Sequence, residues 1–510
     1  MKPTRPAIDV ARGASYLIIM NIAITAISLA AFAIIARLIS REEMGGLAVL
    51  TLVSSGAQLL SGLGLGSTAI KFVSSSRATG DYEKMRQAGY ECLTITGLGL
   101  MVLIVAIYSS ADVLASSLLG STSRATLLRL LTLEIGANGI GASLVSILYG
   151  LRKFKVISLS NMASFAVRQS LVVMFLELGW GLPGIVIGWG IGDSLNSLVL
   201  GGFTRKFLGP PKFGFGFVRL LKFSAPLFLG GAANYAWTWF DRALLLPFVS
   251  LAQLGSYNVA VTAFGVLHSM PSSISGTLFP FYSHLYSDGS SDSQTAGLEN
   301  AVRTASRYVS FLIIPVSVGL AVTALPAATL FAGNNYADAA SPLAILSVSF
   351  AVACLGTALS QIFVVLGKTI TSAIVTILSV LIPFFLGILL ISNFGVLGAA
   401  MARGLSLIVA LVLSVLILRR ILKVRFDLGA YRSAWLASLA MGVAVLALQF
   451  FFYSKYLLPV YMAVGGVVFI LSLRLLHAFN REDIELISDF LKPYPRLGFV
   501  TRWFEKLLGV

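Results

Sequence analysis

Long apolar stretches separated by short polar segments recur along the whole length of this 510-residue chain. Each stretch approaches the roughly 20 apolar residues that a helix needs to cross a bilayer. Fourteen of them are recognisable, at about 13–37, 45–70, 88–110, 127–150, 158–177, 182–204, 223–248, 254–280, 304–326, 339–366, 370–392, 395–418, 433–452 and 456–476. The pattern predicts an all-α, polytopic membrane protein with about 14 transmembrane helices.

Basic residues gather at alternate ends of these stretches. Most of the 37 Lys and Arg fall on one side of the membrane if the N-terminus is cytoplasmic, which is the distribution typical of cytoplasmic loops. The alternation predicts an even number of spans, with both termini in the cytoplasm. The net charge of +16 is then mainly a topology signal, and no basic-aromatic groove pattern indicates a nucleic-acid partner.

The composition agrees with a membrane protein, since 57% of the residues are hydrophobic and 11% are charged, against about 25% charged in soluble proteins. The first apolar run is too long for a signal peptide and no cleavage site follows it, so we expect it to be retained as a span. Cys92 and Cys354 fall in apolar segments and the three histidines are scattered. We therefore expect no disulfide, metal site or cofactor.

Two segments of the chain have similar sequences. LISREEMGGLAV, at the end of the first span, aligns with FVSLAQLGSYNV at the end of the seventh, so that Ser40 meets Ser250 and Gly45 meets Gly255. Such repeats are common in transporters. They predict two pseudo-symmetric six-helix lobes of the same orientation, with a cavity between them. The expected boundaries are 1–210 and 211–425 for the lobes, 426–478 for two further helices and 479–510 for a cytoplasmic amphipathic tail.

The segments ARLISREEMGGLAV, DRALLLPFVSLAQLGSYNVA and LYGLRKF, with the number and spacing of the spans, resemble polysaccharide-repeat (O-unit type) flippases. These belong to the multidrug/oligosaccharidyl-lipid/polysaccharide (MOP) exporter superfamily. The resemblance implies a transporter of the cell membrane, not an enzyme, that moves a lipid-linked oligosaccharide or polysaccharide repeat unit to the outer leaflet by alternating access. Its partners would be membrane lipids and the anionic phosphate or pyrophosphate of the carrier lipid. We expect a monomer, whose first, second, seventh and eighth spans line the cavity.

The stretch WTWFDRALL places Asp241 and Arg242, two candidates for substrate binding, inside the seventh predicted span. A charge at the bilayer centre costs roughly 2.5–3.5 kcal/mol, so it persists where it faces protein or water. Adjacent helix positions point in different directions, so each side chain needs a partner from another span. Arg242 would bind a phosphate oxygen, because guanidinium meets phosphate bidentately. An ion pair between helices that fixes lobe packing is the alternative.

Three more polar residues in predicted spans are candidates for substrate binding. Arg403 has no acid in the neighbouring spans of its lobe and could face water or a phosphate. Asn21 and Gln58, on the first and second spans, could bind sugar hydroxyls. Hydrogen bonds between helices are the alternative for both amides.

A further group could serve packing or coupling. Arg168 and Asp193 lie in one predicted lobe and are expected to form a structural ion pair. Asp193 and His268 are also possible coupling groups, because a histidine pKa lies near neutrality. Glu134 is expected to contact Arg129 near the membrane surface.

Two other functions compete with the flippase. A MATE-like, cation-coupled exporter of drugs or small molecules needs an acidic site, and Asp193 would have to supply it because the first span holds no acid. An integral-membrane glycosyltransferase needs acids for a metal or a base. Glu42 and Glu43 are the only acidic pair in the predicted outer loops, and a capping turn also explains them.

Overall fold

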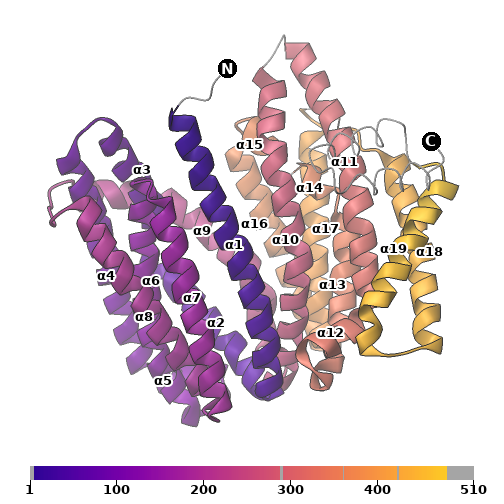
Figure 1. Ribbon diagram of the computed structural model, residues 1–510, viewed down its shortest axis with the longest axis horizontal. Coiled ribbons are helices and arrows are strands. Elements are labelled where there is room, and N and C mark those ends of the chain that lie inside the picture. The colour runs from indigo at the N-terminus through magenta and orange to yellow at the C-terminus, as the bar shows by residue number, and fades with distance from the viewer. Residues whose placement is uncertain (1–4, 288–290, 360, 422–423, 479–510) are drawn as a thin grey trace. The chain divides into compact units, whose positions relative to one another are not determined.

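The computed structural model describes residues 5–287, 291–359, 361–421 and 424–478. These residues form helices and contain no β-strand (Figure 1). The all-α, polytopic class predicted from the hydrophobic pattern is confirmed. The predicted amphipathic tail, 479–510, lies outside the described residues.

Twelve helices in the described part of the chain are long and apolar enough to cross a membrane. Helices α9 (Phe217–Leu245) and α10 (Leu251–Ser287) occupy the seventh and eighth predicted spans but are not among these twelve. In α9 the apolar run is interrupted by Asn234, Thr238 and the Asp241–Arg242 pair. The predicted count of fourteen spans is therefore not confirmed.

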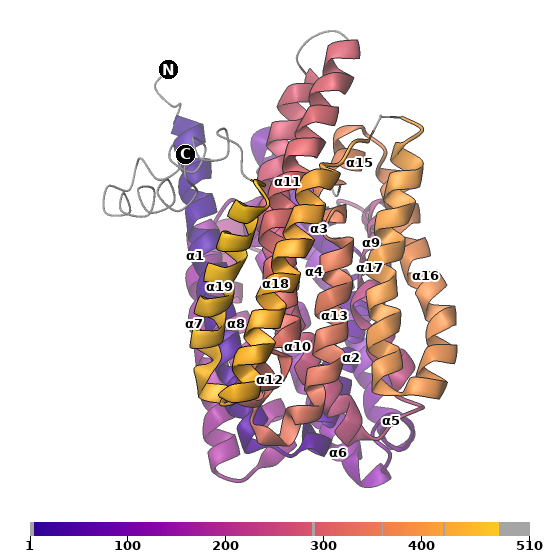
Figure 2. The same cartoon turned by 90° about the vertical axis from the view of Figure 1, so that its right-hand side faces the viewer.

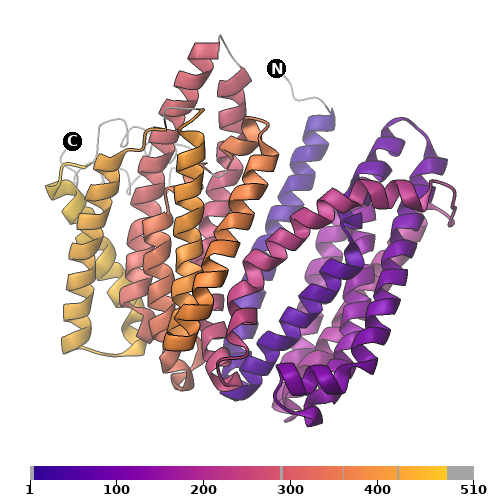
Figure 3. The same cartoon turned by 180° about the vertical axis from the view of Figure 1, so that it is seen from behind.

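The chain divides into two compact units, Met1–Asn258 and Val259–Val510. In the first unit α8 packs on α6 and α7, α1 packs on α7, and α9 packs on α2, α3 and α4. Figure 3 shows α9 running obliquely across the α2–α3 side. The elements of this unit, besides α9 and the start of α10, are α1 (Arg5–Leu38), α2 (Arg41–Gly62), α3 (Leu65–Ala78), α4 (Tyr82–Ser109), α5 (Ala111–Leu118), η1 (Thr122–Arg124), α6 (Ala125–Gly150), α7 (Phe154–Glu177) and α8 (Gly181–Leu208).

In the second unit α17 packs on α13 and α16, and α18 packs on α11 and α19, so that these helices lie side by side (Figure 2). Its elements, besides the rest of α10, are α11 (Ser291–Val322), α12 (Ala324–Ala332), η2 (Asn334–Ala339), α13 (Ala340–Ala353), α14 (Gly356–Leu359), α15 (Ile362–Val365), α16 (Thr369–Phe394), α17 (Val396–Leu418), α18 (Leu428–Phe451), η3 (Lys455–Leu457) and α19 (Leu458–Leu475). The lobe boundaries expected from the sequence remain a prediction.

The second predicted span is broken in the middle. Leu63 and Gly64, with φ of 45° and 75°, separate α2 from α3. A Cβ at Gly64 would lie 2.6 Å from the carbonyl oxygen of Ser224 on α9, so this left-handed turn needs glycine for space as well as for conformation. Helix α10 is not interrupted in this way over 268–280.

Helices α2 and α10 begin in the same way. The side-chain oxygen of Ser40 accepts the Glu43 amide at 3.2 Å, and Glu43 accepts the Ser40 amide at 2.9 Å. The aligned Ser250 accepts the Gln253 amide at 3.3 Å, and Gln253 accepts the Ser250 amide at 3.2 Å. Two capping boxes thus stand at the positions that the repeat aligns.

Candidate functional site

Asp241 is completely buried at the end of α9, with 0% of its surface exposed. Its Oδ2 accepts a hydrogen bond from the Tyr257 hydroxyl at 2.7 Å, and its Oδ1 accepts one from the Arg242 amide at 3.0 Å. Tyr257 belongs to the first turns of α10, so the aspartate ties α9 to the next helix. A partner from another span is expected for this carboxylate from the sequence, and Tyr257 on α10 is such a partner.

Arg242 lies in the last turn of α9 and is half-buried. Because α9 ends at Leu245, the arginine is closer to a helix end than the predicted span implied. Its guanidinium carbon lies 4.5 Å from the ring centroid of Trp239. The carbonyl groups at a helix C-terminus and an aromatic face both favour a cation. The helix end and the indole therefore position the guanidinium.

A polar pocket of about 330 Å³ lies within the first unit, between α1, α6, α7 and α8. Ser160 donates to Asn196 at 2.9 Å, and Asn196 donates to Asn161 at 3.1 Å. The pocket is lined by Ile24, Asn138, Gly141, Ala142, Val145, Asn161, Ser164, Phe165, Asp193, Asn196 and Ser197. Amide and hydroxyl groups of this kind can hold water, a small ion or a sugar hydroxyl.

Arg168 and Asp193 form an ion pair at the wall of this pocket, with Arg168 Nη1 3.3 Å from the carboxylate. The Arg168 guanidinium carbon also lies 4.8 Å from the ring centroid of Trp189. Both partners are largely buried, with side-chain exposures of 18% and 15%. The pair therefore places a neutralised carboxylate beside a polar hollow.

The expected contact between Glu134 and Arg129 is wrong. Glu134 is 2% exposed, and it accepts hydrogen bonds from Ser54 at 2.7 Å and Asn138 at 3.0 Å. Arg129 instead pairs with Asp112 at 2.7 Å. Packing of α2 on α6 brings Ser54 to Glu134, and the separation of 80 residues between them gives no signal in the sequence.

The other candidate residues have different surroundings. Asn21 is exposed on α1, and in the described part of the chain its side chain makes no hydrogen bond. Gln58 donates to Ser54 at 3.1 Å, so it extends the Glu134 cluster. In the second unit, Arg403 is buried on α17 at 8% exposure. His268 lies with its ring centroid 5.5 Å from that of Phe350.

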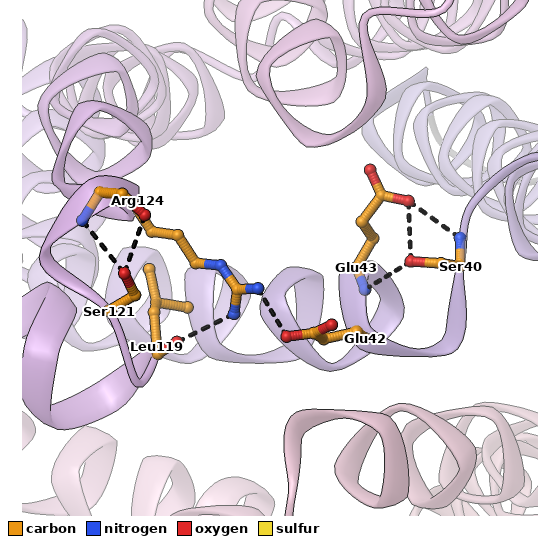
Figure 4. A network of polar contacts seen from close by, with 7 residues as sticks. Ser40, Glu42, Glu43, Leu119, Ser121 and Arg124 are labelled. Atoms are coloured by element: carbon orange, nitrogen blue, oxygen red, sulfur yellow. Dashed lines mark hydrogen bonds and ion pairs between the residues drawn. The ribbon is translucent and has the colours of Figure 1, made fainter.

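Figure 4 shows the end of the first unit at which α2 and α6 begin, the Ser40 end. Glu43 completes the capping box with Ser40. Glu42 pairs with Arg124 at 2.6 Å, and Arg124 also donates to the Leu119 carbonyl at 2.9 Å. Both carboxylates of the acidic pair are therefore engaged in local structure.

The chain matches the family model described as "Polysaccharide biosynthesis protein" over residues 34–341. It belongs to this family. ExoT of Rhizobium meliloti, a succinoglycan biosynthesis transport protein, is 25% identical over 356 residues that make up 68% of each chain. Agl15 of Haloferax volcanii, a probable low-salt glycan biosynthesis flippase, is 26% identical over 223 residues, or 43% of this chain and 45% of Agl15. This chain thus matches less than half the length of Agl15.

Two solved structures share the fold. The lipid II flippase MurJ, in an inward closed conformation, has a TM-score of 0.71 at 17% identity and covers 89% of this chain and 98% of its own. An inward-facing MATE transporter of the MOP superfamily has a TM-score of 0.62 at 16% identity and covers 78% and 94%. The chain shares its fold with MOP-superfamily transporters, as the resemblance implied, and this polysaccharide biosynthesis protein is a multi-span protein of the cell membrane.

Proposed function

We propose that this protein is a flippase that moves a lipid-linked saccharide from the cytoplasmic to the outer leaflet of the cell membrane by alternating access. The carrier lipid bears a phosphate or pyrophosphate. The protein acts as a monomer with both termini in the cytoplasm, and it makes or breaks no covalent bond. The family, the flippase and transport names of its relatives and the polytopic fold support this proposal.

The observation that carries the proposal is the pairing of Arg242 with Trp239 at the end of α9. A guanidinium can fork two phosphate oxygens and stays charged in an apolar environment. Trp239 is buried at 8% exposure, so the indole holds the guanidinium in a fixed position. Burial of Asp241 against Tyr257 holds the helix end that carries both groups. A guanidinium held in this way suits the phosphate of a lipid-linked saccharide.

Substitution of Arg242 tests this role. We expect Arg242→Ala to reduce delivery of the lipid-linked saccharide to the outer leaflet at least tenfold, and Arg242→Lys to retain part of it, because an ammonium keeps the charge and loses the fork. The measurement is labelling of the glycan from outside the cell in a host that lacks its own flippase. Arg129→Ala, in an exposed ion pair, is the matched control. Equal delivery by the Arg242→Ala and control variants would refute the assignment.

We further propose Asp193 as the coupling group, because its carboxylate borders the polar pocket. A proton or small cation entering the pocket would compete with Arg168 for that carboxylate. Asp193→Asn should abolish the dependence of delivery on a proton or sodium gradient, whereas Arg168→Gln should shift the dependence to lower ion concentration. A gradient dependence that persists in Asp193→Asn would exclude this role. His268 packs against the rings of Phe264 and Phe350 and suits coupling less well.

The MATE-like exporter is the second candidate, because the Asp193 pocket also suits a small-molecule or cation site. Resistance to cationic drugs, measured with the wild-type and Asp193→Asn proteins, separates it from the flippase. Arg403, Asn21 and Gln58 remain proposed contacts of the saccharide. Alanine at each should weaken delivery less than Arg242→Ala does.

A further inference from the structure

A second hollow, of about 240 Å³, lies at the opposite end of the first unit, where α4 begins and α3, α6 and α8 end. We name this the Gly209 end. The basic side chains around the hollow are Arg77, Arg86, Lys153 and Lys206. Within the described residues, none of these four forms an ion pair with a carboxylate.

The acids nearest to the hollow in sequence are already engaged elsewhere. Asp81 lies 2.8 Å from the ammonium of Lys84 and accepts the hydrogen bond that begins α4. Glu83 pairs with Lys212 at 2.9 Å. The hollow is therefore surrounded by cations, with the local negative charge directed to other partners.

Contacts with the backbone hold the two arginines at the rim. Arg77 donates to the carbonyl oxygen of Leu151, and Arg86 Nε donates to that of Leu208 at 2.9 Å. Each guanidinium has five N–H groups, so donors remain for a ligand. Gly209 has a φ of +87°, and a Cβ there would lie 2.9 Å from the Arg86 guanidinium. Glycine at 209 thus leaves the space in which Arg86 lies against the chain.

An aromatic ring positions one of the lysines. Lys153 Nζ lies 4.0 Å from the ring centroid of Phe207, which precedes Leu208 at the end of α8. Lys206 is exposed on the same helix end. Like charges held around one hollow repel each other, and an anion with several acceptor oxygens would relieve this repulsion.

We propose that this hollow binds the phosphate group of an anionic ligand, either a phospholipid of the adjacent leaflet or a soluble phosphate. A headgroup is favoured because the hollow lies at the ends of α3, α4, α6 and α8, the last three of which are long enough to cross a membrane, and basic pockets in such places bind lipid headgroups. Tyr82, 62% exposed beside it, is a residue type that suits the membrane interface. The site is separate from Arg242 and does not depend on which substrate the protein moves.

Two double variants of equal charge test the site. Lys153→Gln/Lys206→Gln removes two cations of the hollow. Lys155→Gln/Arg205→Gln removes two cations that are close in sequence, exposed and outside it. The full-length protein in detergent is titrated with phosphatidylglycerol or with phosphatidylcholine, and the bound lipid is counted by native mass spectrometry. Calorimetry with inorganic phosphate forms a separate arm, and circular dichroism confirms that each variant is folded.

We expect the wild type to bind phosphatidylglycerol in preference to phosphatidylcholine. The Lys153/Lys206 variant should weaken this binding about tenfold or more, and the Lys155/Arg205 variant less than twofold. Binding of inorganic phosphate without phosphatidylglycerol, lost in the Lys153/Lys206 variant, would support the site and assign it to a soluble ligand. Equal weakening by both double variants would show diffuse attraction to a basic surface and overturn the proposal, as would the absence of binding in both arms.

Discussion

At the Ser40 end of the first unit Arg124 and Arg129 pair with carboxylates, whereas at the Gly209 end the basic side chains of the hollow contact backbone carbonyls and an aromatic ring. The carboxylates of the Gly209 end, Asp81 and Glu83, pair with Lys84 and Lys212 outside the hollow. Arg124 pairs with Glu42 and Arg129 with Asp112 at the first end. At the second, the ammonium of Lys71 lies 3.8 Å from the ring centroid of Phe223. A cation and a carboxylate form a pair with no net charge. A cation that contacts a carbonyl group or an aromatic ring keeps its net positive charge. The hollow at the Gly209 end therefore holds positive charge that no carboxylate in the described residues neutralises.

The same contrast applies to the carboxylates. Glu91, on α4, is 1% exposed and accepts the amides of Gly214 at 2.5 Å, Phe215 at 2.7 Å and Gly216 at 2.9 Å. Its charge binds the linker between α8 and α9 and leaves the nearby cations unpaired. Glu91 on α4 is thereby connected to the segment that precedes α9, the helix that carries Arg242.

The largest effect is expected from Glu91→Ala. The amides of Gly214, Phe215 and Gly216 lose their charged acceptor, and a hydrogen bond to a charged group contributes about 1.5–3 kcal/mol. The free energy of unfolding should therefore fall by about 3 kcal/mol. Thermal unfolding in detergent can be followed with a dye that reacts with thiols, because Cys92 and Cys354 are both buried. The control is Glu83→Ala, which removes an exposed ion pair. Similar melting temperatures for the two variants would contradict the role of Glu91.

The Ser40 end has its own sensitive position at Gly45. A Cβ there would fall on the carbonyl group of Leu251, and a Cβ at Gly255 would fall on that of Arg41, so α2 and α10 are in backbone contact. Gly45→Ala should destabilise the protein by about 2 kcal/mol, because overpacking of this kind costs about 1–3 kcal/mol.

The neighbouring Gly46 supplies the control for this substitution. A Cβ at Gly46 would lie 2.8 Å from the tip of the Leu182 side chain, which can rotate away. The melting temperatures of Gly45→Ala and Gly46→Ala show whether the backbone contact at Gly45 makes its substitution more destabilising. If Gly46→Ala lowers the melting temperature as much as Gly45→Ala, the backbone contact is not what limits this position.

A smaller effect is expected at the exposed ion pair of the Ser40 end. The side chains of Arg124 and Glu42 are 31% and 58% exposed, and such pairs contribute roughly 0.2–1 kcal/mol. Arg124→Glu and Glu42→Arg should each lower the melting temperature slightly, and the double reversal should restore it. A double-mutant cycle measures this coupling. A double variant no better than the sum of its parts would mean that the pair adds nothing to stability.

Much of this structure is predictable because the bilayer imposes a simple pattern. Apolar length gives the helices, and the repeat correctly aligns Ser40 with Ser250, whose capping boxes are equivalent. Arg168 and Asp193 are also predictable as partners, because two charges in adjacent helices of one unit have few alternatives. In each case the predicted interaction lies within one helix or between neighbouring helices.

What the sequence does not give depends on packing between distant segments. Glu134 receives Ser54 only because α2 lies on α6. The basic hollow is formed by one arginine or lysine from each of four helix ends. Each of these residues is expected from the general excess of positive charge in cytoplasmic loops, but the sequence does not show that the four lie next to one another. The depth of Arg242 depends on where α9 ends, and the hydrophobic pattern of a sequence does not fix the last residue of a helix.

The smallest expected effect on stability is at Asp81, the residue that caps the N-terminus of α4 at the Gly209 end. Its Oδ1 accepts the Lys84 amide at 3.0 Å, and the hydrogen bond from the Lys84 side chain is the main cause that holds its pKa below the ordinary value of 3.8. A depressed pKa in the folded state contributes stability at neutral pH that is lost as the pH falls through that pKa.

Asp81→Asn keeps a good helix cap and removes the charge, so it should be slightly less stable than the wild type at pH 6. The difference in melting temperature should shrink below the ordinary pKa of 3.8, where the wild-type carboxyl takes up its proton. Melting curves of the two proteins between pH 6 and pH 3, in the same detergent, measure it. Glu83→Gln controls for a charge on the same helical turn. A difference that stays constant over this range would show that the backbone cap alone, and not the Lys84 ammonium, determines what Asp81 contributes to the Gly209 end.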